Sequence, residues 1–158
     1  MKIFTLALLF GSALFFLSVG FAQSRQTPFA LTIAAAQAEV PRGSEAKINT
    51  TITNLSNSAV ALEFKNPLCD YSVEVRDSMG NLAPDTDLKK SLDCANVSGR
   101  HINAYLQPHE SFKDAIPVNS LNDISEVGEY SVRVTWKAPR EFGGMVVKSN
   151  TTKITVVP

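Results

Sequence analysis

The stretch "ISEVGEYSVRVTWK" at residues 124–137 decides the fold. In its second half, apolar and polar side chains alternate without a break: Tyr130, Val132, Val134 and Trp136 share one parity, and Ser131, Arg133, Thr135 and Lys137 share the other. A period of two is typical of a β-strand with one buried face. We therefore expect these four apolar side chains to lie in a core.

The same alternation recurs along the chain, at "FALTI" (29–33), "KINTTIT" (47–53), "VALEF" (60–64), "YSVEVRD" (71–77) and a last strand over about 145–157. Turn-forming residues separate these strands at 40–45, 54–59, 77–81, 107–111 and 139–144. Only two short helices are expected, one near 121–125 and one within 84–92. The pattern predicts an all-β antiparallel sandwich of about seven to nine strands.

One further strand is irregular. Asp114 has the parity of Phe112 and Ile116, so we expect a bulge there or a strand exposed on both faces. Pro117 predicts that this strand ends at that point or lies at a sheet edge.

The N-terminus "MKIFTLALLFGSALFFLSVGFA" (1–22) has a lysine, a long apolar run and small residues at its end. This is the pattern of a secretory signal peptide, with cleavage expected between Ala22 and Gln23. The alternative is an uncleaved anchor, because residues 3–22 are long enough to span a bilayer. We expect a signal peptide over 1–22, a single domain over 23–158, and a secreted or periplasmic location.

The charge of the exported part is close to zero. Without Lys2 it has 14 Lys and Arg, against 15 Asp and Glu, with the signs interspersed. This balance predicts no affinity for nucleic acid and none for an anionic membrane surface.

Two cysteines occur, Cys69 and Cys94, and both lie in the exported part. Because that compartment is oxidising, we expect a disulfide between them; a free or functional thiol is the alternative. The bond would hold the long polar span Leu82 to Arg100 against the body of the domain.

Two segments, "LQPHESF" (106–112) and "LNDISEVGEYSVRV" (121–134), resemble the second half of bacterial extracellular immunoglobulin-like modules. The run "VPRGSEAKINTTITNLSN" (40–57) is similar to their first hairpin. The resemblance covers Pro28 to Val157. It implies an immunoglobulin-like sandwich in which Tyr130 forms a tyrosine corner with upstream backbone. His109 stands where relatives carry Gly, which weakens that turn, since a Cβ resists positive φ.

Motifs that carry chemistry are missing from the sequence. It has no nucleophile elbow, zinc-protease helix or phosphate loop, so we expect no enzyme, no catalytic residue and no cofactor. His101 and His109, with Glu110 or Asp114, could bind a metal, but surface roles are the stronger expectation. Sequons begin at Asn49, Asn54, Asn96 and Asn150, and we interpret them as chance.

Two functional hypotheses follow. The first is a non-catalytic binding or structural module that contacts an unknown macromolecule of the cell envelope or extracellular space. The second is a secreted protease inhibitor that acts through a loop at the sandwich end. In either case "APREFGG" (138–144) is a candidate loop, with Arg140 and Phe142 as partner-binding residues. The alternative for Phe142 is that it folds back and plugs the core.

Overall fold

The computed structural model describes residues 27–96 and 102–158. The predicted signal segment, Arg100 and His101 lie outside these ranges. Within them, no helix is long and apolar enough to cross a membrane.

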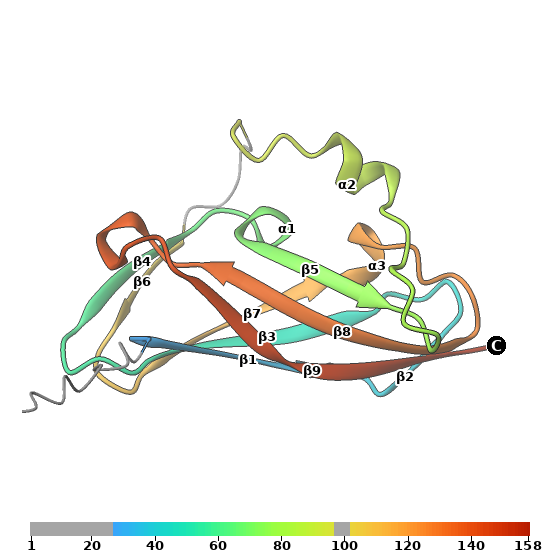
Figure 1. Cartoon of the computed structure of the whole chain (residues 1–158), viewed down its shortest axis with the longest axis horizontal. Helices are drawn as coiled ribbons and strands as arrows, with labels where there is room; N and C mark the ends of the chain where they lie inside the picture. Colours follow the sequence, from blue (N-terminus) through green and yellow to red (C-terminus); the bar gives the residue numbers. More distant parts are fainter. Residues whose placement is uncertain (1–26, 97–101) are drawn as a thin grey trace, which may run out of the picture.

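Nine strands of the described residues form an immunoglobulin-like β-sandwich, which confirms the predicted fold class (Figure 1). One sheet has the order β1-β3-β7, a second has the order β2-β9-β8-β5, and β4 pairs with β6. All strand pairs are antiparallel except β2 and β9. The strands are β1 Phe29–Ala35, β2 Glu39–Pro41, β3 Lys47–Asn54, β4 Val60–Phe64, β5 Tyr71–Arg76, β6 Ile102–Leu106, β7 Ser111–Pro117, β8 Gly128–Lys137 and β9 Val146–Val157.

The alternating strands bury the faces that the sequence predicts. Tyr130, Val132, Val134 and Trp136 of β8 are all buried, and β5 pairs with β8 from Tyr71↔Trp136 to Arg76↔Ser131. Ile48, Thr50 and Ile52 of β3 face the same core. Two layers thus close over one apolar interior, which is what a period of two on each strand requires.

An aromatic cluster fills one end of this core. The ring of Phe29 on β1 lies edge-on to Trp136, with ring centroids 5.2 Å apart. Phe64 on β4 stacks on Phe112 of β7 at 4.1 Å. These contacts join strands from both sheets and from the β4-β6 pair, so the cluster ties the three sheets together.

The helices are short, as expected. The helix predicted within 84–92 is α2, Asp87–Ser91, and Thr86 caps it by accepting from the backbone N–H of Lys89. The turn predicted near 121–125 does not form there; the short helix α3, Val118–Leu121, ends where that turn was expected to begin. The sequence did not predict α1, Pro67–Asp70, or the strands β2 and β6.

Two alternatives were predicted near Asp114, a bulge or a strand exposed on both faces. The bulge is absent, and Ile116 is the one fully buried side chain of β7, so both faces of the strand are at least partly exposed. Strand β7 pairs with β3 without interruption from Lys47↔Pro117 to Thr53↔Ser111, and Asp114 is half-buried opposite Thr50. The edge position predicted from Pro117 is confirmed, since β7 is the last strand of its sheet and ends at that proline. A half-covered edge strand tolerates a carboxylate on its inner face without a bulge.

The irregularity lies instead in the β8-β9 pair, between Arg133 and Thr135. Opposite it, the side chain of Asn150 accepts from the Ile33 N–H at 2.8 Å and donates to the Ile33 carbonyl at 3.0 Å. The Asn150 amide therefore makes the pair of hydrogen bonds that a backbone residue of a neighbouring strand would make, and it joins β9 to the edge of β1. This role accounts for an asparagine at Asn150 without a glycan.

Candidate binding site

The ten-residue strand β8 separates two ends of the sandwich that carry its loops, about 30 Å apart. We name the end formed by the loops 54–59, 107–110 and 138–145 the aromatic end. We name the end formed by the loops 77–84 and 122–128 the corner end. Figure 1 shows the two ends on opposite sides of the molecule.

At the aromatic end, the candidate residues Arg140 and Phe142 lie on a 3-10 turn, Arg140–Phe142. The Phe142 ring packs edge-on against Phe29 at 5.0 Å and is half-buried, whereas Arg140 is exposed. This packing favours the interpretation of Phe142 as a plug. A partner-binding role of the pair stays a prediction.

The loop 138–144 is compact. Phe142 N–H donates to the Pro139 carbonyl at 3.0 Å and Gly143 N–H to the Arg140 carbonyl at 2.8 Å. Gly143 follows in the left-handed region at φ 77°, which glycine adopts without strain. The loop is thus a tight turn rather than an extended segment, and this does not favour insertion into a protease cleft.

The turn before β7, also at the aromatic end, contains His109 at φ 67°. The predicted turn therefore forms despite the Cβ. It is held by Asn54, which is fully buried: its side-chain N–H groups donate to the carbonyls of Ser58, Leu106 and Gln107. Asn54 thus holds two loops together by hydrogen bonds, and its burial leaves no room for a glycan.

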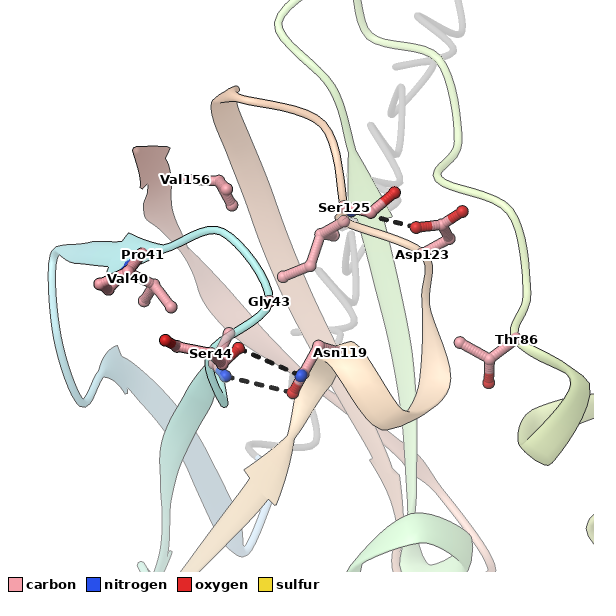
Figure 2. Close-up of a pocket in the computed structure, with 11 residues that line it drawn as sticks. Val40, Pro41, Gly43, Ser44, Thr86, Asn119, Asp123, Ser125 and Val156 are labelled. Carbon is pink, nitrogen blue, oxygen red and sulfur yellow. Dashed lines mark hydrogen bonds between the residues drawn. The ribbon is translucent and has the colours of Figure 1, made fainter. Parts of the chain in front are cut away.

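At the corner end, a pocket of about 160 Å³ opens between the loop after β2 and the segment that leads into β8 (Figure 2). Its floor is apolar, formed by Val40, Ala46, Ile124 and Val156, all buried. The Asn119 side chain closes one wall by accepting from Ala46 N–H at 3.1 Å and donating to the Ser44 carbonyl at 3.3 Å. An apolar floor with a polar rim is the usual composition of a binding pocket.

A groove of about 320 Å³ adjoins this pocket, and the two share Asp123 and Ser125. The groove runs between the segment Leu82 to Pro84 and the segment 123–130. Two of its apolar side chains are exposed, Leu82 at 61% and Val127 at 50%. Because these two side chains are exposed, the groove presents apolar surface to solvent in addition to its polar rim.

Backbone and side-chain hydrogen bonds fix the groove walls. Asp123 N–H donates to the Pro84 carbonyl at 2.7 Å, and Ala83 N–H donates to the Val75 carbonyl at 2.9 Å. The Tyr130 hydroxyl donates to the Glu126 carbonyl at 3.0 Å, which confirms the predicted tyrosine corner. The groove is therefore formed before any partner binds.

The groove is acidic, since its lining includes Asp77, Asp123, Glu126 and Glu129 but no Lys or Arg among the residues that the structure describes. Glu126 pairs with Arg42 at 3.6 Å, and Glu129 pairs with Lys153 at 2.7 Å. Asn81 donates a side-chain hydrogen bond to Asp77, and this lowers the pKa of that carboxyl.

The pKa of Asp123 is lowered too, first by its hydrogen bond with the Ser125 side chain and then by the Ser125 N–H. Burial raises the pKa of Tyr130, and the charges of Glu126, Asp123 and Asp77 raise it further. Three of the four groove carboxylates therefore lie close enough to Tyr130 for their charges to raise its pKa.

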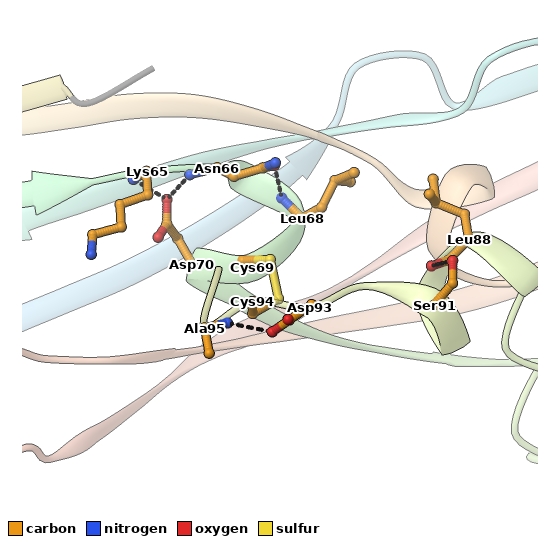
Figure 3. Close-up of a disulfide and its surroundings, with 10 residues drawn as sticks. All are labelled: Lys65, Asn66, Leu68, Cys69, Asp70, Leu88, Ser91, Asp93, Cys94 and Ala95. Carbon is orange, nitrogen blue, oxygen red and sulfur yellow. Dashed lines mark hydrogen bonds between the residues drawn. A yellow bond between two sulfur atoms is a disulfide. The ribbon is translucent and has the colours of Figure 1, made fainter. Parts of the chain in front are cut away.

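The predicted disulfide between Cys69 and Cys94 is present (Figure 3). Cys69 lies on α1, whose first turn is capped by Asn66 accepting from Leu68 N–H at 2.9 Å. Asp70 closes the other side by accepting from the N–H groups of Lys65 and Asn66, both at 2.8 Å. The bond therefore attaches the polar excursion that follows β5 to a well-capped turn beside that strand.

Two carboxyls flank a small cavity near α1. Asp70 and Asp114 line it together with the apolar residues Phe64 and Ile102. Burial raises the pKa of both carboxyls, and Asp114 raises that of Asp70 further. Burial also raises the pKa of Tyr71 well above its ordinary value. Within residues 27–96 and 102–158, no three His, Cys, Asp or Glu side chains gather as metal ligands.

The sequence did not single out Leu82, Val127 or Asp123. One signal was available: three carboxylates, Asp123, Glu126 and Glu129, fall within seven residues around the start of β8. The other was the length of the excursion that starts at Leu82, since long connections in compact domains are often functional.

No family model matches the sequence, and neither does any curated protein. Among solved structures, the CARDB domain of PF1109 from Pyrococcus furiosus is 15% identical, with a TM-score of 0.42, over 82% of this chain and 94% of that one. A crystal structure of that domain in complex with di-metal ions gives 15% identity and a TM-score of 0.42, over 82% of this chain and 92% of that one. A β-glucosidase from Listeria innocua is 17% identical, with a TM-score of 0.42, over 81% of this chain and 16% of its own. Similarity of this size carries no conclusion about partners or activity.

Proposed function

We propose that this chain is an exported, non-catalytic immunoglobulin-like module that binds a macromolecule of the cell envelope or extracellular space through one end of its sandwich. The observation that carries the proposal is the preformed groove at the corner end, where Leu82 and Val127 are exposed beside a pocket with an apolar floor. Exposed apolar side chains gathered at a rigid concave site are typical of protein interaction surfaces.

Export is supported by two features. The signal-like N-terminus predicts secretion. The disulfide between Cys69 and Cys94 is of the kind that persists in oxidising compartments and is rare in the cytosol. Fractionation of cells that express the full chain should place the protein, with this disulfide intact, outside the cytoplasm.

The binding role can be tested by site-specific photo-crosslinking in the cells that make the protein. A photoreactive amino acid is placed at Leu82 in the corner end, at Arg140 in the aromatic end, or at Thr151 on the exposed face of β9. We expect a discrete crosslinked product from an end position and none from Thr151. The absence of crosslinks at both ends would contradict a binding module.

A further inference from the structure

We propose that the corner-end groove binds a cationic peptide segment that carries an aliphatic side chain. This inference rests on the proposed function and names the class of partner. It is argued from one feature of the geometry: the apolar pocket and the acidic groove are adjacent, and both are lined by Asp123 and Ser125.

The pocket fits a side chain better than a free metabolite. Its volume is about 160 Å³, whereas small-molecule sites begin at roughly 300 Å³. The buried floor residues Val40, Ile124 and Val156 offer only hydrocarbon. An aliphatic side chain of a longer chain can enter here, while the rest of that chain follows the groove past Leu82 and Val127.

The charge of the groove selects the rest of the segment. Glu126 and Glu129 already have cationic neighbours, Arg42 and Lys153, but the described residues show no ion pair for Asp77 or Asp123. Both aspartates accept hydrogen bonds within their own loops, which fixes the position of their charge. A Lys or Arg close to the aliphatic anchor in the peptide would face them, whereas phosphate groups of nucleic acid or lipid would be repelled.

The two features have different roles. Ion pairs at exposed positions add little affinity but govern association rate and selectivity. The apolar contacts supply most of the affinity, and the fixed walls reduce the ordering cost of binding. Binding should therefore need both an aliphatic and a cationic residue in the same peptide.

The test uses the full-length exported protein and a fluorescent peptide that alternates lysine and leucine, read out by fluorescence anisotropy. Two control peptides replace every lysine by glutamate or every leucine by serine. We expect the lysine-leucine peptide to bind about ten-fold or more tightly than either control, and added salt to weaken it.

Variants then locate the site. Leu82→Ser with Val127→Ser should weaken the peptide about ten-fold, whereas Leu55→Ser, an exposed leucine at the aromatic end, should leave binding unchanged. Asp77→Asn with Asp123→Asn should also weaken binding, because it removes the two carboxylates that would face the cationic residue, and Glu141→Gln at the aromatic end serves as a control. Circular dichroism should show an unchanged fold for every variant, because the substituted side chains are exposed except for the half-buried Asp77, and Asn keeps an oxygen that can accept the same hydrogen bonds.

Three results would overturn the inference. The first is equal binding of the glutamate-leucine peptide, and the second is unchanged binding by both double variants. The third is complete displacement of the peptide by spermine at equal concentration, which would assign the charge site to free polyamines. Crosslinks at Arg140 but not at Leu82 would also overturn it while leaving the proposed binding module intact, so the two failures are distinguishable.

Discussion

The hydroxyl of Tyr130 donates a hydrogen bond to the backbone carbonyl of Glu126, four residues earlier, at 3.0 Å. The Tyr130 ring is buried in the core, while Glu126 lies in the exposed wall of the groove. A single side chain thus holds a surface loop in register with the central strand β8.

Removal of this bond should loosen the wall. Tyr130→Phe keeps the ring and deletes the hydroxyl, so we expect a loss of about 1 kcal/mol in the free energy of unfolding. Hydrogen exchange at the amides of Val127 and Gly128 should accelerate. The matched control is Tyr105→Phe, since Tyr105 is exposed on β6. Equal stability of wild type and Tyr130→Phe would show that the bond contributes nothing.

The disulfide should stabilise the domain mainly through its unfolded chain. Cys69 and Cys94 are 25 residues apart, and closing a loop of that length contributes about 3.5 kcal/mol in the chain-entropy model. We expect Cys69→Ala with Cys94→Ala to lower the free energy of unfolding by about that amount in urea titrations. The strands should remain folded in this variant. Amide hydrogen exchange should increase first around α2. An unchanged unfolding midpoint would contradict this account.

The half-buried carboxyl of Asp114 should cost stability at neutral pH. Its folded-state pKa is raised by burial above the ordinary 3.8, so the folded protein holds this proton more firmly than the unfolded chain. The contribution is therefore most favourable at low pH and is lost as the pH rises through the raised value.

Asp114→Asn tests this sign. The variant should melt at a higher temperature than wild type at pH 7, and the difference should shrink as the pH falls towards 3.8. Glu39→Gln on β2 is a suitable control, since Glu39 is exposed. If the wild type melts at a higher temperature than Asp114→Asn at pH 7, the buried carboxylate does not destabilise the fold and this prediction is wrong.

The sequence predicted the strands whose two faces differ. In β5 and β8 the alternation reflects real burial, so periodicity alone located the core. Strand β2 was not predicted because it has only three residues. It forms by parallel pairing with Thr155 to Val157, and a local sequence pattern carries no information about that contact. Strand β6 escaped because its inner residues Ile102 and Ala104 are only half-buried.

The candidate site could not be predicted in the same way. Leu82 and Val127 are 45 residues apart and become neighbours of one groove through tertiary hydrogen bonds, such as that from Asp123 N–H to the Pro84 carbonyl. Local propensity carries no information about such a pairing. Phe142 shows the converse: the composition of its loop allowed either an exposed anchor or a plug of the core, and the choice depends on packing against Phe29, far away in sequence.

Substitution of Phe142 separates a plug from a binding residue. Phe142→Ala removes the ring that packs against Phe29. We expect the free energy of unfolding to fall by about 2–3 kcal/mol. This is somewhat less than the loss for a fully buried Phe, because the Phe142 ring is half-exposed. Arg140→Ala, two residues earlier and exposed, should leave stability unchanged. Urea titrations followed by Trp136 fluorescence report the difference directly, since Trp136 also contacts Phe29. If Phe142→Ala keeps the wild-type midpoint but abolishes crosslinking from Arg140, the loop is a binding site and the plug interpretation fails.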